Sequence, residues 1–167
     1  ACAKLVCALG LPVSWTTPDG FLVQQAYRCW DRHRVETVLD GAVAKIIVAQ
    51  PGLEVDKRAQ QQGIAPNWVH SMDACALRMF VNTAVANGLH DFALVHDSYG
   101  APAAKVDLMV AALKEAFVSL YTDHDPMLDF YFDLLDQLPP EAVEKLPRPP
   151  SKGDLDISAL RKSDYFF

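Results

Sequence analysis

The stretch FALVHDSYGAPA, residues 92–103, runs from mostly apolar residues directly into a histidine and a carboxylate, His96 and Asp97. A short apolar run followed by turn residues is typical of a buried strand. The residues after the tip begin a returning strand, and Pro102 confines that strand to an edge because proline donates no backbone hydrogen bond. The stretch therefore predicts an antiparallel hairpin with His96 and Asp97 at its tip.

A side chain at the tip of such a hairpin is held rigidly and in the open. The carboxylate of Asp97 stays close to the backbone, and carboxylate oxygens are ligands that Mg²⁺ prefers. An Asp-Ser pair at a tip, however, most often forms a turn that satisfies its own backbone. By itself the motif leaves both interpretations open, a structural turn and a metal site.

A helix is expected upstream of this hairpin, from Pro66 to Asn87. Proline is tolerated in a first helical turn, and Gly88 favours a C-terminal stop. Apolar residues recur at a spacing of three to four and predict the buried face: Val69, Met72, Cys75 or Ala76, Met79 and Thr83.

His70, Asp73 and Leu77 project from a different face of this expected helix. His70 and Asp73 are three residues apart and within reach of each other. Alone, the pair is equally consistent with a surface contact or with Asp73 facing the positive end of the helix dipole.

Two further hairpins are expected nearer the N-terminus. PVSWTTPDGFLVQQAYRCW, residues 12–30, has a strong turn at Pro18-Asp19-Gly20. RVETVLDGAVAKIIVAQP, residues 34–51, has a type I′ turn signal at Asp40-Gly41, and we expect Pro51 to end it.

The second half of the chain is mainly helical in pattern. An amphipathic helix is expected over residues 105–121 and another over 126–138, with Pro126 in its first turn. Shorter helices are expected at 141–146 and in the tail, where Asp156 is a candidate cap. Helices combined with antiparallel hairpins predict the α+β class.

Composition excludes some functions. The 167 residues contain no apolar run near 18 residues, so we expect no membrane partner. The four cysteines form no CxxC pair, which argues against structural zinc and favours a reducing cytoplasm.

The net charge of −6 argues against binding to nucleic acid, but basic residues gather between Arg28 and Arg58 as a weak sign of a phosphate-facing surface. The first methionine is Met72, so we expect a piece of a longer polypeptide.

The motifs combine into a family resemblance. GIAPNWVHSMDACALR (63–78), followed within thirty residues by FALVHDSYG (92–100), closely resembles the single-subunit DNA-dependent RNA polymerases of bacteriophages and mitochondria. WTTPDGFLVQQAY (15–27) resembles a hairpin that precedes the promoter-reading loop of that family. FYFDLLDQL (130–138) and the stretch from LPRPPSKGD to the terminal YFF (146–167) resemble its C-terminal end.

The resemblance implies the C-terminal part of such a polymerase. Residues 1–65 would be the end of the fingers, including a hairpin like the promoter-specificity loop. Residues 66–167 would be the C-terminal half of the palm, an antiparallel hairpin with helices. The terminal aromatics Tyr165, Phe166 and Phe167 would fold back as a foot near the catalytic centre.

The resemblance also implies roles for site residues. Asp97 would be the second of two metal-binding aspartates, His96 its catalytic neighbour, and His70 a residue near the nucleotide ribose that favours ribose over deoxyribose. The cofactor would be Mg²⁺, in a two-metal mechanism. The family's first aspartate and its nucleotide-binding Lys and Tyr have no match in residues 1–62, so we expect the isolated chain to be inactive.

The implied partners are promoter DNA, the template strand, nascent RNA, ribonucleoside triphosphates and the missing N-terminal part of the same polymerase, in the cytoplasm of a bacterial host. Arg34, Asp40, Val48 and Gln50 would lie near base-reading positions, although valine cannot hydrogen-bond to base edges. Two alternatives remain at this stage: a related DNA polymerase, and an inert prophage remnant that keeps only DNA contacts.

Overall fold

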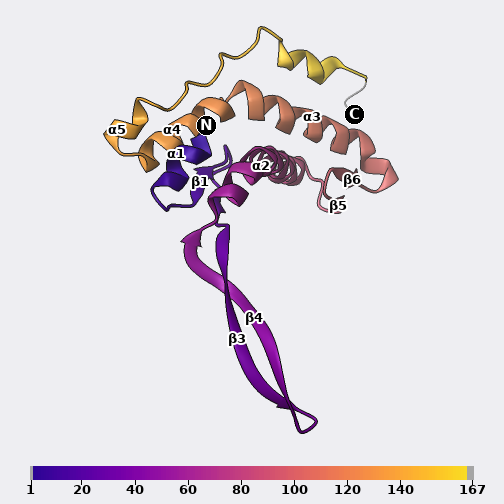
Figure 1. The fold of residues 1–167 in the computed structure, drawn as a ribbon. Coiled ribbons are helices and arrows are strands. Elements are labelled where there is room, and N and C mark those ends of the chain that lie inside the picture. The colour runs from indigo at the N-terminus through magenta and orange to yellow at the C-terminus, as the bar shows by residue number, and fades with distance from the viewer. Residues whose placement is uncertain (1, 165–167) are drawn as a thin grey trace.

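The protein is described by a computed structural model over residues 2–164, as helices with three small antiparallel sheets. The helices form a body from which one long ribbon of two strands projects (Figure 1). In chain order the elements are α1 (Cys2–Ala8), β1 (Val13–Thr16), β2 (Leu22–Gln25), β3 (Arg28–Leu39), β4 (Ala42–Val55), α2 (Lys57–Ala86), β5 (Ala93–Val95), β6 (Ser98–Gly100), η1 (Ala103–Lys105), α3 (Val106–Thr122), α4 (Pro126–Gln137), α5 (Pro140–Val143) and η2 (Ile157–Lys162). This mixture agrees with the α+β class expected from the sequence.

The first expected hairpin is confirmed as β1 and β2. Val13 pairs with Gln25, and Trp15 pairs with Val23. Gly20 takes a φ of 85°, a left-handed conformation that glycine adopts without steric cost.

The second expected hairpin is confirmed as β3 and β4, and it is longer than predicted. Asp40 and Gly41 have φ of 51° and 80°, as a type I′ turn requires. The expectation that Pro51 ends the hairpin is wrong, because β4 continues to Val55, which pairs with Arg28. Each strand of this ribbon has a single neighbour, so Pro51 can stand in β4 without leaving a central ladder bond unmade.

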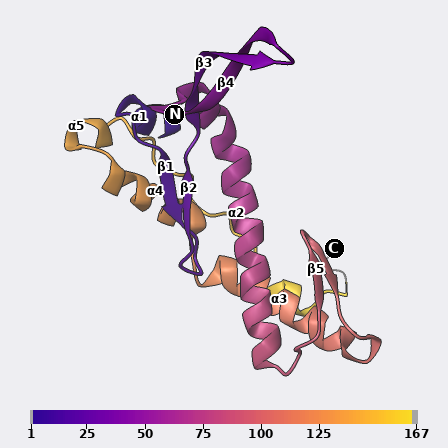
Figure 2. The same ribbon diagram turned by 90° about the horizontal axis from the view of Figure 1, so that it is seen from below.

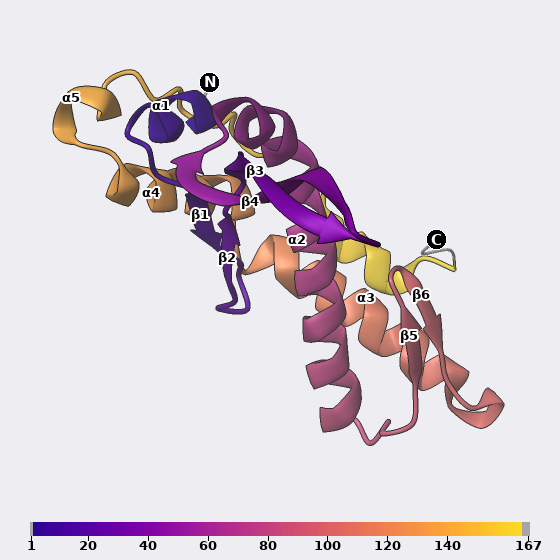
Figure 3. The same ribbon diagram turned by 60° about the horizontal axis from the view of Figure 1, so that its bottom comes forward.

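The expected start of the long helix at Pro66 is wrong, because α2 begins at Lys57. Asp56 caps it: its carboxylate accepts hydrogen bonds from the backbone N–H of Arg58 at 3.0 Å and of Ala59 at 2.9 Å. Pro66 therefore lies inside the helix, where its ring crowds the preceding turn and no N–H is available. The first turns of α2 are inclined to the rest of the helix in Figure 3, and Pro66 accounts for the bend.

The expected stop of this helix is confirmed. The last helical residue is Ala86, and Gly88 has a φ of 84°. The N–H of Leu89 donates to the carbonyl of Ala84 at 2.9 Å, and the N–H of Gly88 donates to that of Val85 at 3.0 Å. This is the Schellman pattern, and the buried Leu89 side chain secures it.

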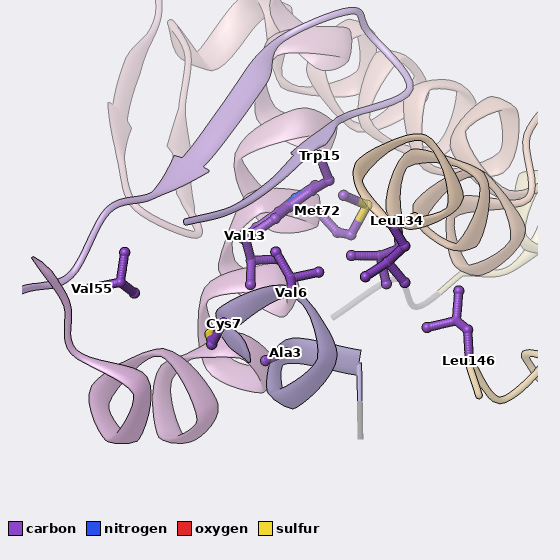
Figure 4. Packing of buried hydrophobic residues seen from close by; sticks show 10 residues of the cluster. Ala3, Val6, Cys7, Val13, Trp15, Val55, Met72, Leu134 and Leu146 are labelled. Atoms are coloured by element: carbon purple, nitrogen blue, oxygen red, sulfur yellow. The ribbon is translucent and has the colours of Figure 1, made fainter. Parts of the chain in front are cut away.

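One buried cluster joins α1, β1, α2 and α4 around Trp15, which is 1% exposed (Figure 4). The indole N–H of Trp15 donates to the hydroxyl of Ser71 at 2.9 Å. The sequence pattern did not predict α1, whose Ala3, Val6 and Cys7 face this cluster. Its buried members are Ala3, Val6, Cys7, Val13, Trp15, Val55, Met72, Leu134, Leu138 and Leu146.

A second buried cluster lies between α2 and α3. Its members are Phe80, Ala84, Leu89, Met109, Ala112, Leu113 and Ala116. Of the stripe expected on α2, Met72 and Cys75 are buried, but Val69 is 50% exposed and its expected burial is wrong. The helix α2 thus belongs to both clusters. It also runs without interruption across the expected boundary between residues 65 and 66.

The helices expected in the second half are confirmed. Pro126 opens α4, and the Asp156 carboxylate caps η2 by accepting the N–H of Ser158 at 3.0 Å. The segment before η2 returns along α3 (Figure 1), where Lys152 donates to the carbonyl of Tyr121 at 2.8 Å. Within residues 2–164, none of the helices has the length and hydrophobicity that crossing a bilayer requires.

Candidate active site

The predicted site residue His70 lies on α2, and Asp73 lies beside it. His70 and Asp73 are exposed and one helical turn apart, so their side chains share a face. Both follow Pro66 along α2, and α2 packs on α3 through the second buried cluster (Figure 2).

The predicted residues His96 and Asp97 form the turn between β5 and β6. Val95 pairs with Ser98, which leaves His96 and Asp97 as the two turn residues, both exposed. His96 has a φ of 54°. A left-handed conformation costs an ordinary residue about 1–2 kcal/mol, and glycine would adopt it freely. Strained backbone conformations cluster at active sites and ligand-binding sites, so the left-handed His96 supports a functional role for the turn.

Aromatic contacts fix this hairpin on the helices. The ring of Phe80 meets the ring of Tyr99 edge-on at 5.1 Å and that of Phe92 at 6.0 Å between centroids. Only one face of the hairpin packs on the helices. The 65% exposure of Val95 shows that the other face is open. The prediction of a buried strand is therefore wrong for this chain: β5 and β6 pair only with each other, and no second layer within residues 2–164 covers Val95.

The structure brings both predicted motifs to one open cavity of about 870 Å³. Its walls are His70, Asp73, Ala74, Leu77, His96 and Asp97. A smaller adjoining cavity of about 100 Å³ is lined by Asp73, His96, Asp97 and Tyr99, among others. The side chains of His70, His96 and Asp97 come from separate segments of the sequence and thus line a common space.

Asp73 was not among the predicted site residues, yet it lines both cavities. Its spacing from His70 was the available sign. Burial raises the pKa of the Tyr99 phenol above its usual value, and the negative charges of Asp73 and Asp97 add to that effect. The site is therefore acidic, with two carboxylates near one half-buried phenol.

An acidic, exposed turn is suited to a magnesium ion. Asp97 offers carboxylate oxygens, and Mg²⁺ usually takes one or two protein carboxylates together with waters and phosphate oxygens. Within residues 2–164, no group of three or more His, Cys, Asp or Glu side chains is arranged to enclose a metal. Asp97 thus offers an exposed carboxylate at this turn.

The predicted DNA-contacting residues lie on the β3–β4 ribbon, away from this cavity (Figure 1). Arg34 pairs with Ile47, whereas Val48 pairs with His33 and Gln50 with Asp31. Because successive side chains of a strand point to opposite faces, Arg34 lies on one face of the ribbon, and Val48 and Gln50 lie on the other. Asp40 stands in the turn at the tip.

Tyr165, Phe166 and Phe167, the expected foot, lie outside the described residues.

The sequence of the chain is similar to those of DNA-dependent RNA polymerases. The family model of DNA-dependent RNA polymerase matches residues 3–145. The DNA-directed RNA polymerase of Enterobacteria phage K11 is 39% identical over 93% of the chain and 17% of its own length. T7 RNA polymerase of Escherichia phage T7 is 37% identical over 93% of the chain and 18% of its own length. DNA-directed RNA polymerase 1, mitochondrial, of Nicotiana sylvestris is 37% identical over 99% and 16%. The chain thus spans about a sixth of the length of these relatives.

Proposed function

Because this chain belongs to the DNA-dependent RNA polymerase family, we propose that it forms the C-terminal part of a longer polymerase that copies a DNA template into RNA. Residues 1–65 would form the end of the fingers domain, and residues 66–167 would form the C-terminal half of the palm domain. Its partners would be promoter DNA, the template strand, nascent RNA and ribonucleoside triphosphates. A phage-type enzyme of this kind would act in the cytoplasm of a bacterial host.

The observation that supports this function most is the shared cavity. His70 on α2 and the His96-Asp97 turn line one open space, although they come from separate segments. A cavity of about 870 Å³ is within the range of small-molecule sites, and a nucleotide is of that class. Its polar groups are imidazoles and carboxylates, the groups that hold a metal-bound triphosphate and orient a sugar.

Ribonucleotidyl transfer forms a bond between the 3′ oxygen of the RNA and the α-phosphorus of the incoming nucleotide, and it breaks the bond to the leaving pyrophosphate. Bound Mg²⁺ would favour ionisation of the 3′ hydroxyl and offset charge on the pyrophosphate. Asp97 would hold the metal from the rigid turn. A second carboxylate is expected from sequence outside this chain, so the isolated 167 residues would not make RNA.

The two histidines would orient the reactants. His96, held in its left-handed conformation, would stand beside the metal-holding carboxylate. His70, which lines the same cavity from α2, would contact the nucleotide, and a hydrogen bond to the ribose would favour ribonucleotides over deoxyribonucleotides. Such discrimination is strong when a site is built to bond a hydroxyl group.

The β3–β4 ribbon would contact promoter DNA. Arg34 would bind phosphate or guanine, while Asp40 and Gln50 carry groups that can bond base edges. Val48 would contribute apolar contact, for example with a thymine methyl group.

The test is Asp97→Asn in the full-length polymerase, with Asp107→Asn on α3 as the matched control. We expect RNA synthesis on a primed template to fall by about a hundredfold or more for Asp97→Asn and to stay unchanged for the control. Near-normal synthesis by the Asp97 variant in Mg²⁺ would refute the metal-holding role.

A further inference from the structure

The β1–β2 hairpin lies against α2, and a second cavity opens between them. Two polar contacts join these elements: the amide nitrogen of Asn67 donates to the side-chain oxygen of Gln25 at 2.8 Å, and the indole of Trp15 donates to the hydroxyl of Ser71 at 2.9 Å. We call this cavity the hairpin groove. It has a volume of about 340 Å³, and its walls include Phe21, Gln24, Asn67, His70, Ala74 and Arg78.

The hairpin groove shares a wall with the candidate-site cavity, the space of about 870 Å³ described above. His70 and Ala74 line both. They are four residues apart on α2 and therefore lie on the same face of the helix. Ala74 is exposed and carries only a methyl group, so its side chain adds little bulk between the two spaces. The hairpin groove thus continues the candidate-site cavity along α2.

Volume decides which space beside the candidate-site cavity can hold a second nucleotide. Small-molecule sites have volumes of about 300–1,000 Å³. The hairpin groove, at about 340 Å³, lies within this range. The other adjoining cavity, which Tyr99 lines, has a volume of only about 100 Å³. A nucleotide next to the one in the candidate-site cavity therefore fits the hairpin groove and does not fit the smaller cavity.

Charge favours the same space. Asp73 and Asp97 line both the candidate-site cavity and the smaller cavity, whereas the described residues that line the hairpin groove include no Asp or Glu. A phosphodiester is negatively charged, and carboxylates repel it where no metal ion lies between them. The hairpin groove instead presents the guanidinium of Arg78 and the imidazole of His70. A nucleic-acid backbone can therefore enter the groove without an ion of its own.

The remaining groups of the hairpin groove suit bases of any sequence. The side chain of Phe21 is 55% exposed even with the Arg78 guanidinium 4.6 Å from its ring centre, and aromatic rings stack on all four bases. Gln24 is exposed, and its amide can both donate and accept hydrogen bonds at base edges. This tolerance is what a growing RNA strand requires of its binding site.

We propose that the hairpin groove binds the 3′-terminal nucleotide of the growing RNA, next to the incoming nucleotide in the candidate-site cavity, and that the small side chain of Ala74 leaves room between the two positions. The inference rests on the proposed function, which puts the incoming nucleotide beside His70. Each added nucleotide would move from the candidate-site cavity into the groove before the next one binds.

The test is Ala74→Leu in the full-length polymerase, with Ala111→Leu on α3 as the matched control. Both alanines are exposed in helices, and leucine is a good helix former, so neither change should disturb the fold. Ala111 lines none of the three cavities. Fluorescence anisotropy measures the Kd for a DNA template with an annealed RNA primer, without nucleotides. We expect the Kd to rise about tenfold for Ala74→Leu and to stay unchanged for Ala111→Leu.

A second variant separates lack of space from other effects at residue 74. Serine is close to alanine in size, so Ala74→Ser should bind the primed template as the unsubstituted polymerase does. An equal loss of binding in Ala74→Ser, equal losses in Ala74→Leu and Ala111→Leu, or unchanged binding by Ala74→Leu would overturn the proposal. A change confined to KM for ribonucleotides would overturn it too, because it would restrict Ala74 to the incoming nucleotide.

RNA synthesis by Asp97→Asn reports the proposed function separately. Near-normal synthesis by that variant, together with weak primer binding by Ala74→Leu, would refute the metal-holding role alone. Lost synthesis by Asp97→Asn, together with unchanged primer binding by Ala74→Leu, would refute the role of the groove alone.

Discussion

The guanidinium of Arg78 on α2 donates hydrogen bonds to both carboxylate oxygens of Asp19, which lies 59 residues earlier in the β1–β2 turn. Arg78 also donates to the hydroxyl of Thr17 at 3.1 Å and stacks over the ring of Phe21 at 4.6 Å. The Asp19 side chain is 12% exposed and that of Arg78 is 32% exposed. The pair therefore fixes the N-terminal hairpin to the helix that carries the candidate site.

Arg78→Ala is expected to lower the free energy of unfolding of the 167-residue chain by about 2–3 kcal/mol, because it leaves a mostly buried carboxylate without its partner. Urea unfolding followed by circular dichroism measures the change. Arg161→Ala is the control, since Arg161 makes a similar two-bond contact with Glu115 in an exposed position. The control should be nearly neutral. Equal losses in both variants would contradict the importance assigned to burial.

The free energy of unfolding should also depend on pH through the Asp19 carboxyl group. The hydrogen bonds from Arg78, with a smaller contribution from Thr17, hold the pKa of the Asp19 carboxyl well below its usual range. A depressed folded-state pKa contributes stability that is present above the unfolded pKa of about 3.9 and is lost as pH falls toward the folded value. Between pH 7 and pH 3, the advantage of the unsubstituted chain over Asp19→Asn should shrink by about 1 kcal/mol. A constant difference over that interval would contradict this coupling.

His96→Gly should make the chain more stable and the polymerase less active. Glycine relieves the left-handed conformation of residue 96, and we expect a gain of about 1 kcal/mol in the free energy of unfolding. Asp97→Gly is the control, since Asp97 is not left-handed and should gain nothing. RNA synthesis by the full-length His96→Gly variant should fall. A loss of stability would show that the imidazole contributes more to the turn than its backbone costs.

Cys75 should resist alkylation in the folded chain. Burial, aided by the negative charge of Asp19, raises the pKa of its thiol to about 11, so only about one molecule in a thousand carries a thiolate at pH 8. Iodoacetamide followed by peptide mass spectrometry should label the half-buried Cys29 well before Cys75. In urea both should be labelled. Rapid labelling of Cys75 without urea would mean that the contact between α2 and the β1–β2 turn opens readily.

His70→Ala in the full-length polymerase should raise KM for ribonucleotides and reduce the preference over deoxyribonucleotides by about tenfold or more, because a hydrogen bond to the ribose would be lost. His90→Ala is the control, since His90 is exposed and does not line the cavity. Single-nucleotide extension with each sugar provides both values. If the preference for ribonucleotides over deoxyribonucleotides is unchanged, a residue other than His70 must contact the ribose.

The turns were predictable because their chemistry is local. Gly20, Gly41 and Gly88 all take positive φ, and glycine at such positions is recognisable from its neighbours. The start of α2 was not predictable in this way. Proline at position 66 resembles a helix start, whereas the true start depends on the Asp56 cap and on Gln60. The buried side-chain oxygen of Gln60 accepts a hydrogen bond from the Gln25 amide on β2. Such a contact over 35 residues has no signature in the local pattern.

The candidate site was predictable in its residues but not in its arrangement. His70 and Asp97 were recognisable from motifs, yet only packing of α2 against α3 and of Tyr99 on Phe80 brings them to one cavity. Asp73 was missed as a site residue for the same reason. The prediction for Val95 was wrong for a different reason. Its apolar side chain predicted burial, but none of the described residues covers it.

One continuous helix begins at the root of the β3–β4 ribbon and carries His70 on its side. From Lys57 to His70 is 13 residues, or about 20 Å along the helix at 1.5 Å per residue. No loop therefore separates the ribbon from the wall of the cavity, because the chain passes from Val55 through the Asp56 cap directly into the helix that carries His70.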